Sequence, residues 1–210
     1  PAGYDTLDAL GALYVTDGHE YAPDHLGGLV TTLDNLLADG QIAPVVAVFI
    51  DPRNPDTLDQ NRRETEFIAN PDFASFVADE LVGYVEARYR VRADRNARVI
   101  LGTSFGGFFA AYLGATRPDV FTRLAIQSPA FQRHPQILDA YAHAPAAPYR
   151  IWLSQGTLFD GDWARRLRGV LDENGYAFTY AERAEGHAWA HWRALLPSVL
   201  RYHFGLLPAP

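Results

Sequence analysis

The sequence contains no cysteine, no methionine and no lysine. Without cysteine, the chain cannot form disulfides, use a thiol nucleophile or hold a metal ion through thiolates. The compartment stays undecided, because both reducing and oxidising locations tolerate a chain without cysteine. All of the 18 basic residues are arginine, and 25 acidic residues give a formal net charge of −7. Since nucleic-acid binding needs clustered positive charge, this balance argues against a nucleic-acid partner.

Long apolar runs and a recognisable leader are also missing. The best apolar run, residues 43–50, is far shorter than the roughly 18 residues that a membrane-spanning helix needs, so we expect no membrane span. No signal-peptide pattern occurs at the start of the chain. A chain that begins with Pro1 and has no methionine is expected to be a fragment or a processed form, so its localisation stays unknown.

The length and the order of the segments predict one α/β domain over residues 1–210. Short apolar segments predict six strands, over residues 13–16, 45–50, 99–101, 124–127, 150–153 and 178–182. Helical spacing of apolar residues predicts helices over residues 24–38, 72–85, 105–116, 134–144, 163–173 and 189–204. This alternation predicts a mostly parallel sheet with helices on both faces. Such sheets carry their sites beyond the carboxyl ends of the strands.

Three local expectations accompany this assignment. The strand at 45–50 is β-branched and apolar on both faces, which is typical of a strand buried in a parallel sheet. Asp72 is the candidate N-cap of the second helix, whose apolar stripe would include Phe76 and Tyr84. The polar, proline-punctuated stretch 51–70 reads as a long connection, and long connections in compact domains are often functional.

The strongest motif follows the third predicted strand. Residues 102–106 read Gly-Thr-Ser-Phe-Gly, the G-x-S-x-G pattern of a nucleophile elbow. The serine of such a turn must stand clear of the sheet on a strained backbone, and side chains two positions before and after it would collide. Gly102 and Gly106 meet that need, and a helix beginning at Phe105 would favour negative charge nearby. The pattern alone is weak, but its place between a strand and a helix makes Ser104 the candidate nucleophile.

A serine hydroxyl needs a base, and the base needs an orienting carboxylate. In a nucleophile-elbow fold the chain order is serine, acid, histidine. His187 follows the last predicted strand and a glycine, and it is the candidate base among the seven histidines. Asp160 lies after the fifth strand and is the preferred acid. Asp162 is the alternative acid, although an aspartate at that place commonly caps the following helix.

The tetrahedral intermediate of such a reaction needs two backbone N–H donors. Phe105, the residue after the nucleophile, is the first candidate. The second is expected in the loop after the first strand, from His19 or otherwise from Gly18. Asp17 is expected to hold that loop through side-chain hydrogen bonds.

Several segments occur in the order found in one known family. They are Leu13–Gly18, Val48–Asp51, Arg63–Glu66, Gly102–Gly107, Gln127–Ala130 and Gly186–Arg193. Over nearly its whole length the chain resembles the esterase group of α/β-hydrolases. This group contains enterochelin, feruloyl and acetyl-xylan esterases, S-formylglutathione hydrolase and mycolyltransferases. The ending around His187 is most similar to the enterochelin-esterase branch. The resemblance implies an α/β-hydrolase fold, a serine esterase mechanism and no metal or other cofactor. Members of the group usually begin with further antiparallel strands, which this chain is expected to lack, and the acid varies in this branch.

Other residues are candidates for substrate contact. One reading of Arg63 and Glu66 is an ion pair that braces the long connection. The other is that Arg63 contacts an anionic or catechol-rich substrate. Phe131, Phe159, Trp163 and Trp189 could line an aromatic pocket, although aromatic residues at such positions are more often core.

The leading hypothesis is therefore hydrolysis of a small-molecule carboxylic ester through an acyl-enzyme. Acyl transfer to an alcohol would use the same residues. A non-catalytic binding module on the same fold is a third reading, against which the intact order of Ser104, Asp160 and His187 argues. The sequence does not fix the acyl group, the alcohol or the oligomeric state.

Overall fold

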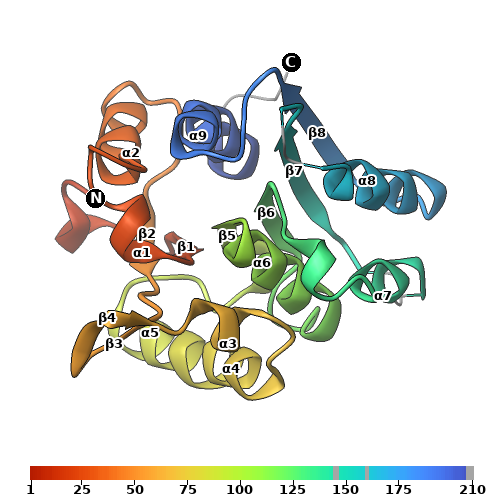
Figure 1. The fold of residues 1–210 in the computed structure, drawn as a ribbon. Helices are drawn as coiled ribbons and strands as arrows, with labels where there is room; N and C mark the ends of the chain where they lie inside the picture. Colours follow the sequence, from red (N-terminus) through yellow and green to blue (C-terminus); the bar gives the residue numbers. More distant parts are fainter. Residues whose placement is uncertain (144–146, 159–160, 207–210) are drawn as a thin grey trace.

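A six-stranded parallel sheet forms the centre of the protein in a computed structural model, which describes residues 1–143, 147–158 and 161–206 (Figure 1). The strand order is β2–β1–β5–β6–β7–β8, and every neighbouring pair is parallel. The strands are β1 (Gly11–Val15), β2 (Val45–Phe49), β5 (Arg98–Thr103), β6 (Arg123–Gln127), β7 (Arg150–Gly156) and β8 (Phe178–Arg183). Each of them overlaps one predicted strand, so the predicted α/β architecture is confirmed.

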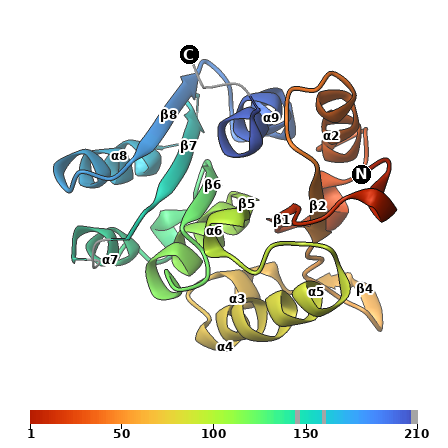
Figure 2. The same cartoon turned by 180° about the vertical axis from the view of Figure 1, so that it is seen from behind.

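Helices cover both faces of this sheet (Figures 1 and 2). One face carries α2 (Leu29–Ala38) and α9 (Trp189–Phe204), which also contact each other. The other face carries α3 (Arg63–Phe67), α4 (Pro71–Ser75), α5 (Val82–Arg88), α6 (Phe105–Thr116), α7 (Ile137–His143) and α8 (Trp163–Glu173). A short helix, α1 (Gly18–Tyr21), follows β1. The described residues also form 3-10 turns at η1 (Tyr4–Thr6), η3 (Arg95–Ala97) and η4 (Phe131–Arg133).

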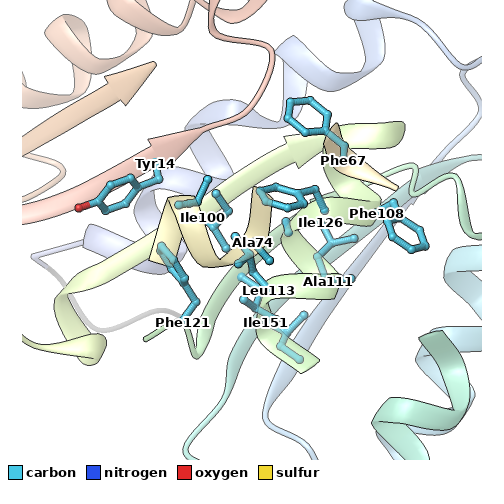
Figure 3. Close-up of a cluster of buried hydrophobic side chains, with 14 of the residues drawn as sticks. Tyr14, Phe67, Ala74, Ile100, Phe108, Ala111, Leu113, Phe121, Ile126 and Ile151 are labelled. Carbon is cyan, nitrogen blue, oxygen red and sulfur yellow. The ribbon is translucent and has the colours of Figure 1, made fainter. Parts of the chain in front are cut away.

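The alternation of side chains along the central strands builds two cores, one on each face of the sheet. In β1, Tyr14 belongs to the core under α6, whereas Leu13 belongs to the core under α2 and α9. Ile100 and Leu101 divide in the same way in β5, where all six residues are buried. Figure 3 shows the larger core, in which Phe108 and other α6 side chains lie over the sheet. A strand buried on both faces needs a continuous apolar run, which explains why the sequence located β5 well.

The predicted helix over residues 24–38 begins later than expected. Residues 24–27 form a turn, and α2 starts at Leu29. Gly28 has a φ of 60°, and a Cβ at Gly27 would lie 2.5 Å from the Tyr21 backbone. The two glycines thus let the chain pass close to α1 and turn sharply before the helix starts.

The predicted helix over residues 72–85 differs in its cap and in its buried face. The N-cap is Asn70 rather than Asp72, because Asn70 Oδ1 accepts hydrogen bonds from the N–H groups of Asp72 and Phe73. A π-helical turn, η2 (Phe76–Leu81), separates α4 from α5. The extra residue in a π turn rotates the following face. Tyr84, which follows the turn, is therefore exposed instead of lying in the apolar stripe. Phe76, the first residue of the turn, is exposed as well.

The stretch 51–70 has secondary structure of its own, which the sequence did not predict. It contains the antiparallel hairpin of β3 (Arg53–Asn54) and β4 (Thr57–Asn61), followed by α3. All of β4 is exposed, so its sequence carries no alternation of apolar and polar residues. This stretch brings Arg63 back to the carboxyl end of the sheet, where Arg63 pairs with Asp17.

The strand β2 lies at one edge of the sheet, and four of its five residues are only partly buried. The prediction that both of its faces are buried is therefore wrong. A groove of about 320 Å³ runs beside β2 and α2 and is lined mainly by apolar side chains, among them Val30, Leu37 and Ala47. None of the candidate site residues lines this groove. No helix in the described part of the chain is long and apolar enough to cross a bilayer.

Candidate active site

Ser104 occupies a strained turn between the end of β5 and the start of α6. Its backbone has φ 58° and ψ −118°, a conformation that residues with a Cβ rarely adopt. The Ser104 N–H donates to the carbonyl of Gln127 at 3.0 Å, and the Ser104 carbonyl accepts from the N–H of Ala130 at 3.1 Å. Hydrogen bonds to the end of β6 thus hold the turn in place. This is the geometry that a nucleophile elbow requires.

The two glycines that flank Ser104 are required by close packing. A Cβ at Gly102 would lie 2.1 Å from the carbonyl oxygen of Gly106. A Cβ at Gly106 would lie 2.1 Å from Thr16 Oγ1, at the end of β1. Both positions therefore exclude any side chain, for the reason that the sequence suggested.

The two backbone N–H groups that were predicted to stabilise an oxyanion belong to Phe105 and His19. The N–H groups of Phe105 and His19 lie in the first turns of α6 and α1, where a helix has no acceptor of its own. Within the described ranges, neither N–H donates to another group of the protein. The N–H of Gly18, in contrast, donates to the Ile50 carbonyl at 2.8 Å. Of the two predicted alternatives for the second donor, the geometry favours His19.

Asp17 is fully buried and forms a two-pronged ion pair with Arg63. Arg63 Nε lies 2.9 Å from Asp17 Oδ1, and Arg63 Nη2 lies 2.8 Å from Asp17 Oδ2. Burial raises the pKa of the Asp17 carboxyl, while the hydrogen bonds from Arg63 act in the opposite direction. Asp17 itself has a positive φ of 51°. The predicted role of Asp17 in holding its loop through side-chain hydrogen bonds is thus seen, with a partner 46 residues away.

The side chain of His19 faces a second acidic group. Its Nδ1 lies 3.3 Å from Asp51 Oδ1, and Asp51 also pairs with Arg53 at 2.6 Å. The hydrogen bonds from Arg53 hold the pKa of the Asp51 carboxyl below its usual value. The loops after β1 and β2 are therefore joined through His19 and Asp51.

The loop that carries His187 is tied to the loop after β7. The N–H of Thr157 donates to the Arg183 carbonyl at 2.8 Å, and the N–H of Leu158 donates to the Glu185 carbonyl at 3.0 Å. A Cβ at Gly156 would lie 2.2 Å from the Glu185 oxygen, so the two loops are in direct backbone contact. The loop expected to hold the acid and the loop that holds the candidate base are thus neighbours.

His187 is exposed, and its ring packs edge-on against the indole of Trp192 with 4.9 Å between ring centroids. Trp192 Nε1 donates to Ser128 Oγ at 3.0 Å, and the Trp192 carbonyl accepts from Gln127 Nε2 at 3.0 Å. Gln127 also accepts a hydrogen bond from the Tyr21 hydroxyl at 3.0 Å. A buried polar network therefore joins the end of β6 to α1 and to the start of α9.

The sequence offered no role for Gln127, Ser128 and Trp192, although they lie in the segments that carry the family resemblance. The available signal was a polar pair, Gln127 and Ser128, at the end of a buried strand. Ser128 has a positive φ of 43°, and its N–H donates to the Ser154 carbonyl at 2.7 Å. Because Gln127 also accepts from the Ser104 N–H, one residue contacts both the serine turn and the helix that follows His187.

Comparison with known proteins identifies the family. The family model described as "Putative esterase" matches residues 1–203, nearly the whole chain. The chain belongs to this esterase family. A relative in Bacillus subtilis (strain 168), the uncharacterized protein YjcH, is 21% identical and matches 96% of this chain and 87% of its own length.

Solved structures agree on the fold of this esterase. A ferulic acid esterase superimposes with a TM-score of 0.79 at 19% identity, over 97% of this chain and 89% of its own. The enterochelin esterase from Shigella flexneri superimposes with a TM-score of 0.82 at 23% identity, over 94% of this chain. The chain spans 51% of that second protein. The predicted α/β-hydrolase fold and membership of the esterase group are thus confirmed.

Of the two candidates for the orienting acid, the structure describes only Asp162. Asp160 lies outside the described residues, as does the predicted substrate contact Phe159. Asp162 occupies the N-cap position of α8, yet its side chain makes no capping hydrogen bond. Instead its carboxylate pairs with Arg166 Nε at 2.9 Å on a half-exposed surface. The capping role expected for the Asp162 side chain is therefore wrong, because Arg166, one turn along the helix, takes the carboxylate.

Two of the predicted substrate contacts, Arg63 and Trp189, have partners within the protein. The expected ion pair between Arg63 and Glu66 is wrong: Glu66 pairs with Arg62 at 2.9 Å, and Arg63 pairs with Asp17. Trp189 is partly buried and packs edge-on against the rings of Tyr21 and Trp192.

Two further aromatic candidates, Phe131 and Trp163, pack in or beside the core. Phe131 is fully buried and packs on Phe108 in the core, so it is not a pocket residue. Trp163 packs at the margin of the same core, under the guanidinium of Arg166. In the part of the chain that the structure describes, no cluster of three or more histidine, aspartate and glutamate residues could hold a metal ion.

Proposed function

We propose that this protein is a serine esterase that hydrolyses small-molecule carboxylic esters through an acyl-enzyme on Ser104. The observation that carries the proposal is the strained backbone of Ser104 between two glycines that tolerate no side chain. Strained backbone conformations of this kind cluster at active sites, and Ser104 is only partly buried. The family, whose solved members include proteins titled ferulic acid esterase and enterochelin esterase, supports the same chemistry.

In the proposed reaction, Ser104 Oγ attacks the ester carbonyl carbon while the imidazole of His187 accepts the serine proton. The N–H groups of Phe105 and His19 stabilise the resulting oxyanion. When the intermediate collapses, the bond from the carbonyl carbon to the alcohol oxygen breaks, and His187 returns its proton to the leaving alcohol. Water then attacks the acyl-enzyme by the same steps, which releases the acid and restores Ser104.

A carboxylate is needed to orient the imidazole, and Asp160 is the proposed acid. The backbone contact between the loops after β7 and β8 supports an acid from this segment. The surface ion pair with Arg166 disfavours Asp162. Exposure of His187 supports access of water to the acyl-enzyme, and hence hydrolysis.

The proposal is tested by the release of p-nitrophenol from short-chain p-nitrophenyl esters. We expect turnover by the wild type and a loss of about 10⁴-fold or more in kcat for Ser104→Ala and for His187→Ala. Ser75→Ala and His143→Ala are matched controls, because both residues are exposed and belong to other elements. A folded wild type without turnover, or a Ser104→Ala variant with wild-type kcat, would contradict the proposal.

A further inference from the structure

We propose that the ion pair between Asp17 and Arg63 is a positioning device that holds both donors of the oxyanion hole and keeps a buried carboxylate from opposing the oxyanion. This inference rests on the proposed function, because it assigns the Phe105 and His19 N–H groups to the ester carbonyl. It goes beyond that function in giving Arg63 a role in kcat, distinct from contact with a charged substrate.

The backbone of Asp17 positions His19. Asp17 stands at the N-cap of α1 in a left-handed conformation, and its carbonyl accepts from the N–H groups of Glu20 and Tyr21 at 2.8 and 3.0 Å. The direction of the His19 N–H therefore follows from the backbone of Asp17. Since the Asp17 side chain is fully buried and held at two points by Arg63, that backbone has little freedom.

The guanidinium of Arg63 also contacts Phe105, which carries the other donor. Arg63 Cζ lies 4.9 Å from the centre of the Phe105 ring, within the range of a cation–π contact. Arg63 thus touches the residue that carries one donor and, through Asp17, fixes the residue that carries the other. The two donors come from segments 86 residues apart, and Arg63 from α3 joins them.

Arg63 also neutralises the charge of the buried Asp17 carboxylate. Asp17 Oδ2 lies 3.0 Å from the position that a Cβ on Gly106 would take, so the carboxylate packs against the first turn of α6. A negative charge there opposes the negative charge that develops on the ester oxygen beside the Phe105 N–H. The guanidinium of Arg63 neutralises it. Removal of Arg63 alone would leave a buried carboxylate without compensation.

The test uses a neutral substrate, p-nitrophenyl acetate, so that binding of a charged group by Arg63 plays no part. We expect Arg63→Ala to lower kcat by about 10- to 100-fold while KM changes less than about threefold. Arg63→Lys should recover part of this loss, because it restores the charge without the two-pronged geometry.

The double variant Arg63→Ala/Asp17→Asn should regain at least about fivefold in kcat over Arg63→Ala, because asparagine tolerates the left-handed backbone and carries no charge. Melting temperatures are measured in parallel. Arg62→Ala is the matched control, because Arg62 neighbours Arg63 but pairs with Glu66 on the surface. Its kcat should equal that of the wild type.

Three results would overturn the inference: an unchanged kcat in Arg63→Ala, a change confined to KM, or a loss that tracks the melting temperature and is not relieved by Asp17→Asn. With an active wild type, these results leave the proposed function intact. A folded wild type that turns over no ester would overturn both.

Discussion

Trp192 donates a hydrogen bond from its indole Nε1 to Ser128 Oγ at 3.0 Å, inside the protein. The same indole supports the ring of His187 edge-on, with 4.9 Å between the centroids. One side chain of α9 therefore connects the candidate base with the end of β6, where Gln127 also accepts the Ser104 N–H. We expect the relative position of His187 and Ser104 to depend on this contact.

Trp192→Phe should weaken both catalysis and folding. Phenylalanine keeps an aromatic ring near His187 but leaves Ser128 Oγ without the indole donor. We expect kcat to fall about three- to thirtyfold and the free energy of unfolding to fall by about 1–3 kcal/mol. The measurements are ester turnover and urea denaturation.

The matched control for that variant is Trp152→Phe. Trp152 is buried in β7, and its Nε1 has no hydrogen-bond partner within the described residues. Its replacement removes similar volume without breaking a hydrogen bond, so kcat should not change. Equal losses of kcat in the two variants would show that the Trp192 hydrogen bond has no specific role.

Gly106→Ala should disrupt the fold at the serine turn. The added Cβ would meet Thr16 Oγ1 at 2.1 Å and Asp17 Oδ2 at 3.0 Å, so β1 or α6 must move. We expect the free energy of unfolding to fall by about 3 kcal/mol or more. Gly169→Ala in α8 has open space around its Cβ and should instead stabilise the protein by about 0.5–1 kcal/mol. A Gly106→Ala protein as stable as wild type would refute the packing described for the turn.

Substitution of the two acid candidates should affect kcat differently. Asp160→Asn should lower kcat by about 10²-fold or more, because the imidazole loses the carboxylate that orients it. Asp162→Asn should change kcat by less than about threefold, because that carboxylate is engaged with Arg166 on the surface. Turnover of a p-nitrophenyl ester measures both. A large loss in Asp162→Asn with none in Asp160→Asn would reverse the assignment.

The buried side chain of His203 should make the stability of the protein depend on pH. It is buried in α9, and burial together with the charges of Arg123 and Arg150 holds its pKa well below the usual value. The folded protein therefore binds fewer protons at this site than the unfolded chain. The stability that the neutral ring contributes is present above the unfolded pKa of about 6.5 and is lost as pH falls below it, by up to about 1.4 kcal/mol per pH unit.

His203→Gln should flatten this dependence between about pH 6.5 and 5, because glutamine does not titrate. Urea denaturation at several pH values measures the slope for both proteins. His143→Gln is the control, since His143 is exposed at the end of α7. If wild type and His203→Gln lose stability in parallel on acidification, His203 is not the group responsible.

The central strands of the sheet could be predicted from the sequence because strands such as β1 and β5 are short apolar runs, buried over their whole length. The start of α6 was equally clear, since the Gly-x-Ser-x-Gly turn fixes it. The hairpin of β3 and β4 could not be predicted, because its exposed residues show no apolar alternation. The face of α5 was missed because a single π turn shifted the phase, which left Tyr84 exposed.

The candidate site, too, could be predicted only in part. The serine turn and the order of acid and base follow from local sequence and position along the chain. The partner of Asp17 could not be predicted in this way. Arg63 is one of 18 arginines, and only the path of the chain through α3 brings Arg63 to Asp17. The network of Gln127, Ser128 and Trp192 was missed for the same reason: its members are distant in sequence, and each could equally have faced solvent.

The identity of the nucleophile is tested most directly by covalent labelling with a fluorophosphonate, followed by intact-mass measurement and peptide mapping. The account predicts a single adduct on the wild type, located at Ser104, and no adduct on Ser104→Ala. It also predicts much slower labelling of His187→Ala, because the base that activates the hydroxyl is gone. An adduct on another residue, labelling of Ser104→Ala at the wild-type rate, or no labelling of the folded wild type would contradict the account.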